Sequence, residues 1–143
     1  DPETLYRRPN SKKVADFIGT MNFIPAKILS EAGDKVEVEA RGLGRVAMDI
    51  SQAPVASGDA TVVGLRPETL TLLYDDQKAP ERETDGVIDE VIYFGDMTYY
   101  DVYLGGTDVE VRLSMRNVPG RPVLDVGTKV RVAWSPSALV LFR

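Results

Sequence analysis

Residues 58–73 read GDATVVGLRPETLTLL, and residues 127–142 read GTKVRVAWSPSALVLF. The two stretches align at an offset of 69 residues without a gap, and they share a residue type at 58/127, 63/132, 67/136, 70/139 and 72/141. Each copy is predicted to form a strand, a turn that contains proline and a second strand. Proline is placed in the turn because it has no N–H to donate to the hydrogen-bond ladder of a central strand. The repeat therefore indicates a duplicated β architecture of two small units, which can share a core.

Alternating apolar and polar residues predict strands outside the repeat as well. KVEVEA at 35–40 and DVEVRL at 108–113 alternate strictly, which is typical of half-buried antiparallel strands whose valines face the core. Further strands are predicted at 24–30, 44–50, 60–65, 69–74, 86–94, 97–104, 128–134 and 138–142. Many short strands separated by glycine-containing turns indicate a barrel or a sandwich.

The chain is expected to divide into four parts. Residues 1–19 read as a short helical segment that Pro9 interrupts and Gly19 ends. Residues 20–76 are predicted to form the first β unit, 77–85 a charged linker and 86–143 the second β unit. Because the sequence starts without methionine inside a helical pattern, we expect it to be cut from a longer protein.

Composition excludes most catalytic chemistry. The 143 residues contain neither cysteine nor histidine, so thiolate chemistry, disulfides, zinc fingers and a Ser-His-Asp triad are impossible within them. Carboxylate catalysis stays open, but the acidic pairs at 75–76, 81/83 and 89–90 are interpreted as solvated surface charge. The net charge of −5 disfavours nucleic-acid binding.

The segment YFGDMTYYDVY at 93–103 holds five of the 11 aromatic residues. Alternation places Tyr100 on a core face with Val102 and Leu104, and Tyr99 on the opposite face with Asp101 and Tyr103. The second face is interpreted as partly exposed tyrosine, with a protein contact or an organic-cation site as the alternatives. Four arginines form the most basic region and either hold an anion or are exposed and paired: Arg112, Arg116, Arg121 and Arg131.

Three segments, taken in order, resemble one family. YRRP at 6–9, VADFIG at 14–19 and NF at 22–23 resemble the junction after the ATPase domain of ATP-binding cassette (ABC) importers. VGLRPE at 63–68 and GTKVRVAWSP at 127–136 resemble the transport-associated OB-like (TOBE) regulatory domain that follows it. VIYFGDMT at 91–98 is most similar to the spermidine/putrescine type, with sugar and glycerol-phosphate importers as the near alternative.

The resemblance implies an all-β fold of two tandem OB-like β-barrels (MOP/TOBE-like) preceded by a short helical segment. It implies a regulatory and dimerisation domain of an importer's ATP-binding subunit, at the cytoplasmic side of the inner membrane. No catalysis, cofactor or metal is expected in these residues, since ATP and magnesium would be bound by the missing ATPase domain. The implied partners are that domain, a second copy of the subunit and the membrane subunits, without nucleic acid.

The apolar run near residue 20 is predicted either to cap the barrel or to dock on the missing domain. The candidates for contact with the ATPase domain are Phe17, Ile18, Met21 and Phe23. Weaker candidates for the contact between domains are Tyr99, Tyr103 and Trp134. Arg66, Pro67 and Glu68 are interpreted as a structural turn, with a ligand loop as the alternative. A small-ligand-sensing module and an OB-type nucleic-acid-binding protein are the alternative functions.

Overall fold

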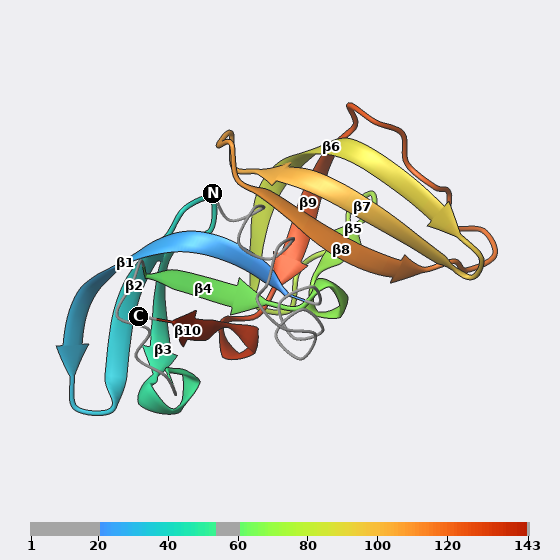
Figure 1. The fold of residues 1–143 in the computed structure, drawn as a ribbon. Helices are drawn as coiled ribbons and strands as arrows, with labels where there is room; N and C mark the ends of the chain where they lie inside the picture. The colour runs from blue at the N-terminus through green and yellow to red at the C-terminus, as the bar shows by residue number, and fades with distance from the viewer. Residues whose placement is uncertain (1–20, 54–60, 143) are drawn as a thin grey trace, which may run out of the picture.

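The computed structural model describes residues 21–53 and 61–142, and it shows an all-β chain there (Figure 1). The described part contains ten strands and three single-turn 3-10 helices. The all-β prediction is confirmed, and each of the ten predicted strands has its counterpart. The predicted helical segment at 1–19 lies outside the described residues, and so do Phe17 and Ile18.

Five antiparallel strands form the first sheet, in the order β10-β4-β1-β2-β3. Their bounds are Asn22–Ala32 (β1), Lys35–Ala40 (β2), Gly44–Asp49 (β3), Val62–Leu65 (β4) and Val140–Phe142 (β10). In β2, Val36 and Val38 are fully buried while Lys35 and Glu39 are exposed, as the alternation predicts. This pattern arises because successive side chains of a strand point to opposite faces.

Five more antiparallel strands form the second sheet, in the order β5-β9-β6-β7-β8. Their bounds are Thr71–Leu73 (β5), Arg82–Phe94 (β6), Met97–Leu104 (β7), Glu110–Arg116 (β8) and Lys129–Trp134 (β9). The 3-10 helices are Ile50–Gln52 (η1), Pro67–Thr69 (η2) and Pro136–Ala138 (η3). The two strand orders match position by position, as a duplication requires.

The two copies of the repeat cross between the sheets. In the first copy β4 belongs to the first sheet and β5 to the second; in the other copy β9 belongs to the second and β10 to the first. The crossings are η2 and η3, where proline takes the first helical position and its missing N–H leaves no gap in a ladder. Residues 71–73 of the predicted unit 20–76 thus lie in the second sheet, and residues 140–142 of the predicted unit 86–143 lie in the first.

Strand β6 begins earlier than the sequence suggests. Residues 82–85, predicted as part of the linker 77–85, pair with β9 from Arg82↔Trp134 to Asp85↔Arg131. The polar side chains here have partners within the fold. Thr84 donates its hydroxyl to the Gly42 carbonyl at 2.8 Å, and the Arg82 guanidinium lies 4.6 Å from the centre of the Trp134 ring. Two of these polar side chains therefore make contacts inside the fold, and that of Thr84 joins the two sheets.

Both sheets contribute to one hydrophobic core. It joins Ile24 and Val63 of the first sheet to Tyr100 and Leu113 of the second, all 1% exposed or less. Leu72 and Leu141, which are equivalent in the repeat, lie on the crossing strands β5 and β10 and are equally buried. Each crossing strand thus fills a position in the sheet of the other half, so the two halves share one buried interior.

Two turns at the junction between the sheets need glycine. Gly42 has φ +89°, and a Cβ added there would lie 2.9 Å from the Cβ of Leu104. A Cβ on Gly105 would lie 3.0 Å from the Gly42 carbonyl oxygen. These distances are too short for ordinary side chains, so glycine allows the β2–β3 turn to pack directly on the β7–β8 turn.

Candidate functional site

The outer face of β6, β7 and β8 presents the tyrosines that the sequence singled out. Tyr99 pairs with Ile92 and Ser114, and Tyr103 pairs with Val87 and Glu110. Tyr103 is 38% exposed and Tyr99 is half-buried. Tyr100, Val102 and Leu104 are at most 1% exposed on the core side, so the predicted assignment of faces is confirmed.

An ion pair with a buried carboxylate lies between the two tyrosines. Asp101 is 5% exposed, and its carboxylate accepts hydrogen bonds from Nε of Arg112 at 2.8 Å and from Nη2 at 3.1 Å. The two residues are direct cross-strand neighbours in β7 and β8. A two-point arginine–carboxylate contact compensates the burial of the charge and fixes both side chains. Arg112 is therefore paired, as the structural interpretation of the basic region expected.

A second acidic group on this face holds a proton near neutral pH. Burial, a hydrogen bond to Asp89 and the charges of Asp101 and Asp89 raise the pKa of Glu110 to about 7. Asp89 lies at the register shift between Ile88 and Glu90, where β6 has an extra residue relative to β7. Such a bulge re-aims a side chain. Asp89 and Glu110 consequently interact across the sheet, and the protonation of this face changes in the physiological range.

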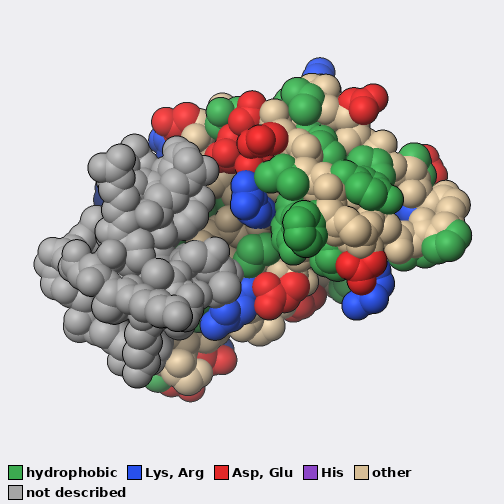
Figure 2. All heavy atoms as spheres, turned by 45° about the vertical axis from the view of Figure 1, so that its right-hand side comes forward, with side chains coloured by type: hydrophobic (Ala, Val, Ile, Leu, Met, Phe, Trp, Pro, Cys, Tyr) green, Lys and Arg blue, Asp and Glu red, His purple; other side chains and the backbone are tan. Residues whose placement is uncertain are grey.

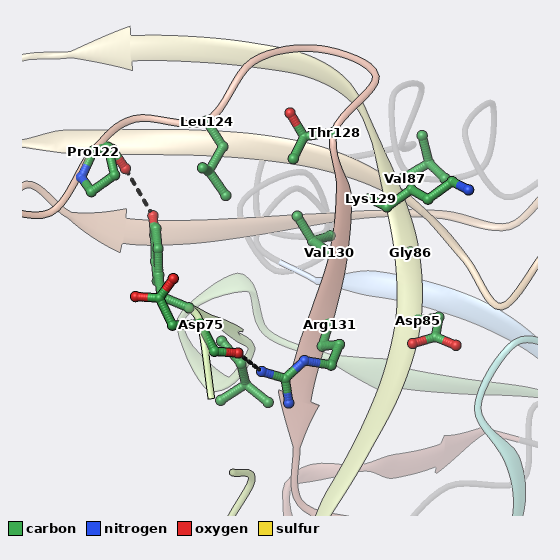
Figure 3. A pocket seen from close by; sticks show the side chains of 12 residues that line it. Asp75, Asp85, Gly86, Val87, Pro122, Leu124, Thr128, Lys129, Val130 and Arg131 are labelled. Atoms are coloured by element: carbon green, nitrogen blue, oxygen red, sulfur yellow. Dashed lines mark hydrogen bonds between the residues drawn. The ribbon is translucent and has the colours of Figure 1, made fainter. Parts of the chain in front are cut away.

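A groove of about 630 Å³ lies beside β5, β6 and β9 of the second sheet (Figure 3). Its apolar lining includes Leu73, Leu124 and Val130, and its charged lining includes Asp85 and Lys129. The remaining lining residues are Tyr74, Asp75, Gly86, Val87, Pro122, Thr128 and Arg131. An apolar floor with a few charged groups is what a small organic ligand needs for burial and orientation.

Two side chains set the shape of this groove. Tyr74 donates its hydroxyl to the Pro122 carbonyl at 3.0 Å, and burial raises the pKa of Tyr74 to about 12, so the hydroxyl stays neutral. The Arg131 guanidinium donates to the carbonyls of Asp75 at 2.8 Å and Gln77 at 2.9 Å. It also lies 3.3 Å from the Glu83 carboxylate. These bonds therefore fix one wall of the groove, and the Arg131 guanidinium takes part in three of the contacts that hold it.

Three further predicted contact residues lie inside the fold. Trp134 is 4% exposed beneath Arg82, and its indole Nε1 has no hydrogen-bond partner among the described residues. Met21 and Phe23 are 5% and 8% exposed, and Phe23 meets Phe142 edge to face with ring centres 5.7 Å apart. Of the five predicted contact residues that the structure describes, Tyr99 and Tyr103 are the two that reach the surface.

Residues 66–68 form the turn between β4 and β5. Pro67 opens η2, and the Arg66 carbonyl accepts the Thr69 N–H at 3.0 Å and the Thr69 hydroxyl at 2.6 Å. Glu68 is exposed. This turn closes the crossing between the sheets.

Two exposed aromatic residues, Tyr93 and Phe94, were not predicted from the sequence as separate candidates. Tyr93 is 64% and Phe94 71% exposed at the end of β6. Both belong to the aromatic segment, but alternation predicts only which face a residue takes and not where the sheet ends. Residues 21–53 and 61–142 contain no helix long and apolar enough to cross a bilayer, and no cluster of metal-ligating side chains.

Comparison with known proteins identifies the family. The TOBE domain matches residues 63–142. The spermidine/putrescine import ATP-binding protein PotA 2 of Pseudomonas aeruginosa is 36% identical over 135 residues, which are 93% of this chain and 37% of that protein. PotA of Nitrosomonas europaea is 32% identical over 142 residues, which are 96% of this chain and 38% of that protein. The chain thus spans a little over a third of these relatives.

A solved structure shares the fold. The molybdate-bound form of the cytoplasmic molybdate-binding protein ModG superposes with a TM-score of 0.60, covering 85% of this chain and 93% of that one at 14% identity. This likeness concerns the fold alone. The chain belongs to the TOBE domain family, as its sequence motifs predict. The family match supports a regulatory and non-catalytic role for these residues.

Proposed function

We propose that this chain is the regulatory domain of the ATP-binding subunit of an ABC importer for polyamines. The observation that carries the proposal is the likeness to spermidine/putrescine import ATP-binding proteins along 93–96% of the chain, together with the TOBE match. Sugar or glycerol phosphate is the alternative cargo. The domain would leave hydrolysis to an ATPase domain of the same protein, which would bind ATP and magnesium.

The proposed physical role is that of a stiff platform between moving partners. Reciprocal crossing of β5 and β10 prevents the two sheets from separating without breaking strand pairs. The outer face with Tyr99 and Tyr103 is proposed to contact a second copy of the subunit. The chain around Phe17 and Ile18 is proposed to contact the ATPase domain, with Met21 and Phe23 anchoring it to the first sheet.

The complete protein is proposed to act at the cytoplasmic side of the inner membrane, together with the importer's membrane subunits. A decisive test uses the complete protein that contains this chain, reconstituted with those subunits in liposomes. ATP-dependent uptake of radiolabelled spermidine or putrescine is expected. Uptake of only a sugar or glycerol phosphate would replace the polyamine assignment, and absence of ATP hydrolysis would overturn the importer assignment.

A residue-level test separates regulation from catalysis. Tyr103→Ala in the complete protein is expected to leave ATP hydrolysis detectable while changing its dependence on the membrane subunits. The matched control is Ile50→Ala, since Ile50 is similarly exposed at 43% but lies on η1, next to the first sheet. Equal behaviour of the two variants would remove the Tyr99/Tyr103 face from the proposal.

A second candidate function is ligand sensing, and the groove beside β5, β6 and β9 favours it. Polyamines, phosphate, molybdate and sugars can be compared by thermal shift, because a ligand that binds only the folded state raises the melting temperature. A shift with one ligand that disappears in Asp85→Asn would support sensing. No shift with any of them would leave the groove without a ligand among these classes.

A further inference from the structure

A small apolar cluster lies on the outer face of the first sheet, apart from the common core. It consists of Met21, Phe23 and Phe142 and is called the outer cluster below. Ile24 and Leu141 are fully buried in the core. Because successive side chains of a strand point to opposite faces, the neighbouring Phe23 and Phe142 point away from the core. The core accordingly includes none of the three residues of the outer cluster.

Gly64 forms the floor of the outer cluster. It lies in β4 between two core residues, Val63 and Leu65, so a side chain at position 64 would point outward. A Cβ added there would lie 3.0 Å from Cε2 of Phe142 and 3.1 Å from Sδ of Met21. Glycine weakens the interior of a strand and often marks the close approach of another group. Here it lets the thioether and the edge of the ring lie directly on the strand.

The outer cluster joins strands from both copies of the repeat. Phe23 of β1 pairs with Gly64 from one side, and β10 pairs with the same residue from the other side, as Figure 1 shows for the order of the strands. The rings of Phe23 and Phe142 meet edge to face across β4, with centres 5.7 Å apart and planes at 63°. Such pairs are stabilising beyond the area that they bury. Phe142, from the second copy, therefore holds the start of β1.

The start of β1 is held on its other face as well. Between Met21 and Phe23, the side chain of Asn22 is bonded to the backbone of Arg112 in the second sheet. Met21 and Phe23 are themselves 5% and 8% exposed. With both faces of the strand fixed, the backbone at residue 21 has a defined position and direction relative to the two sheets.

The outer cluster differs from the other apolar side chains near the surface. Figure 2 shows hydrophobic side chains interspersed with charged ones on the half of the molecule that carries the second sheet. Phe94, 71% exposed, is one example from that sheet, and Ile50, 43% exposed, is one from beside the first sheet. Scattered side chains of this kind need no explanation. An almost buried contact outside the core, built over a glycine, does need one.

We propose that the outer cluster fixes the joint between the first sheet and the part of the protein that precedes residue 21. The inference rests on the proposed function, in which that part is the ATPase domain, and it makes Phe142 and Gly64 positioning residues for the joint. With the outer cluster intact, a movement of the ATPase domain is transmitted to the two sheets. With it disrupted, the ATPase domain stays tethered but loses its fixed orientation.

The first test measures amide hydrogen exchange by NMR in the 143-residue chain. Phe142→Ala removes one ring of the outer cluster, and Gly64→Val displaces its side chains while valine itself favours a strand. Both variants are expected to speed exchange in residues 22–25 about tenfold, as loss of an aromatic pair does. Exchange at Leu113, in the core of the second sheet, is expected to stay unchanged. Ile50→Ala is the matched control and is expected to change neither.

Equal exchange of residues 22–25 in wild type and both variants overturns the proposal. Equally faster exchange at Leu113 also overturns it, because the effect would then be a general loss of stability and not the opening of a joint. The two variants act in opposite ways, one by removing atoms and one by adding them, so a folding defect in one leaves the other as the test. Circular dichroism verifies that each variant is folded.

The second test uses the complete protein and the importer's membrane subunits. Phe142→Ala and Gly64→Val are expected to keep ATP hydrolysis by the protein alone and to lose most of its stimulation by the membrane subunits. Phe142→Tyr retains the ring and is expected to restore that stimulation, and Ile50→Ala to leave it unchanged. A merely structural role would lower hydrolysis equally with and without the membrane subunits. That result, or wild-type stimulation in both variants, overturns the positioning role.

Failure of this proposal is distinguishable from failure of the proposed function. If exchange responds as expected but the complete protein shows no ATP hydrolysis, the outer cluster stands as the joint and the importer assignment falls. If the complete protein imports polyamines while exchange in residues 22–25 is the same in wild type and both variants, the joint falls and the importer assignment stands.

Discussion

The side chain of Asn22 pairs with the backbone of Arg112 as a neighbouring strand would. Its amide nitrogen donates to the Arg112 carbonyl at 2.8 Å, and its amide oxygen accepts the Arg112 N–H at 2.7 Å. Asn22 begins β1 in the first sheet, whereas Arg112 lies on β8, an edge of the second sheet. Edge strands have backbone groups without a ladder partner, so this amide satisfies two of them and joins the sheets.

Asn22→Ala is expected to lower the free energy of unfolding by about 1–3 kcal/mol, because it removes both bonds that its amide makes to a partly buried N–H and carbonyl of β8. Urea unfolding followed by circular dichroism measures the loss. Lys27→Ala, an exposed change in the same strand, is the control and is expected to stay within about 0.5 kcal/mol of wild type. Equal stability of Asn22→Ala and wild type would show that this contact between the sheets makes no net contribution to the free energy of unfolding.

Gly42→Ala and Gly33→Ala separate steric from backbone effects at glycine. Both positions have positive φ, +89° and +62°, but an added Cβ meets Leu104 at 2.9 Å only at position 42. Gly33→Ala is expected to cost about 1–2 kcal/mol for the left-handed backbone alone. Gly42→Ala is expected to cost about 1–3 kcal/mol more, as overpacking does. Thermal or urea unfolding gives both values, and the steric argument fails if they are equal.

Leu72→Ala and Leu141→Ala test the crossing of the repeat. The two leucines occupy equivalent positions on β5 and β10 and are 1% and 0% exposed. Each change is expected to cost about 2–5 kcal/mol, the usual range for a buried leucine. Because the core is continuous, tryptophan fluorescence of Trp134 in the second sheet is expected to report unfolding together with circular dichroism even for Leu141→Ala in the first. Separate transitions would mean that the halves unfold independently.

The acidic pair predicts a pH dependence of stability. Glu110 has a pKa of about 7 in the folded chain against 4.5 as its ordinary value, so the folded chain binds more protons between these two pH values. The free energy of unfolding therefore falls as pH rises from about 4.5 to 7. Glu110→Gln cannot lose this proton, and its stability relative to wild type is expected to rise across that window. Urea unfolding at intervals of one pH unit measures the difference, and a constant difference would contradict the raised pKa of Glu110.

Most of the secondary structure could be predicted from local sequence patterns. Strict alternation in residues 35–40 and 108–113 requires only that one face of a strand is buried, so the strands and the face of Tyr100 could be predicted without knowing their neighbours. The same holds for the proline turns at 67 and 136. The polar start of β6 was predicted as linker, because Thr84 and Arg82 find their partners more than 35 residues away in sequence.

The sequence by itself determined a duplicated all-β chain, because strand periodicity and turn chemistry are local properties, and its motifs resemble the TOBE family. Only the tertiary structure decided that β5 joins β9 and β10 joins β4. The two copies have the same local pattern, so nothing within either copy distinguishes pairing inside one half from pairing across both. The choice depends on the common core that Leu72 and Leu141 complete, and the same long-range packing buries Trp134 and leaves Tyr93 and Phe94 at the surface.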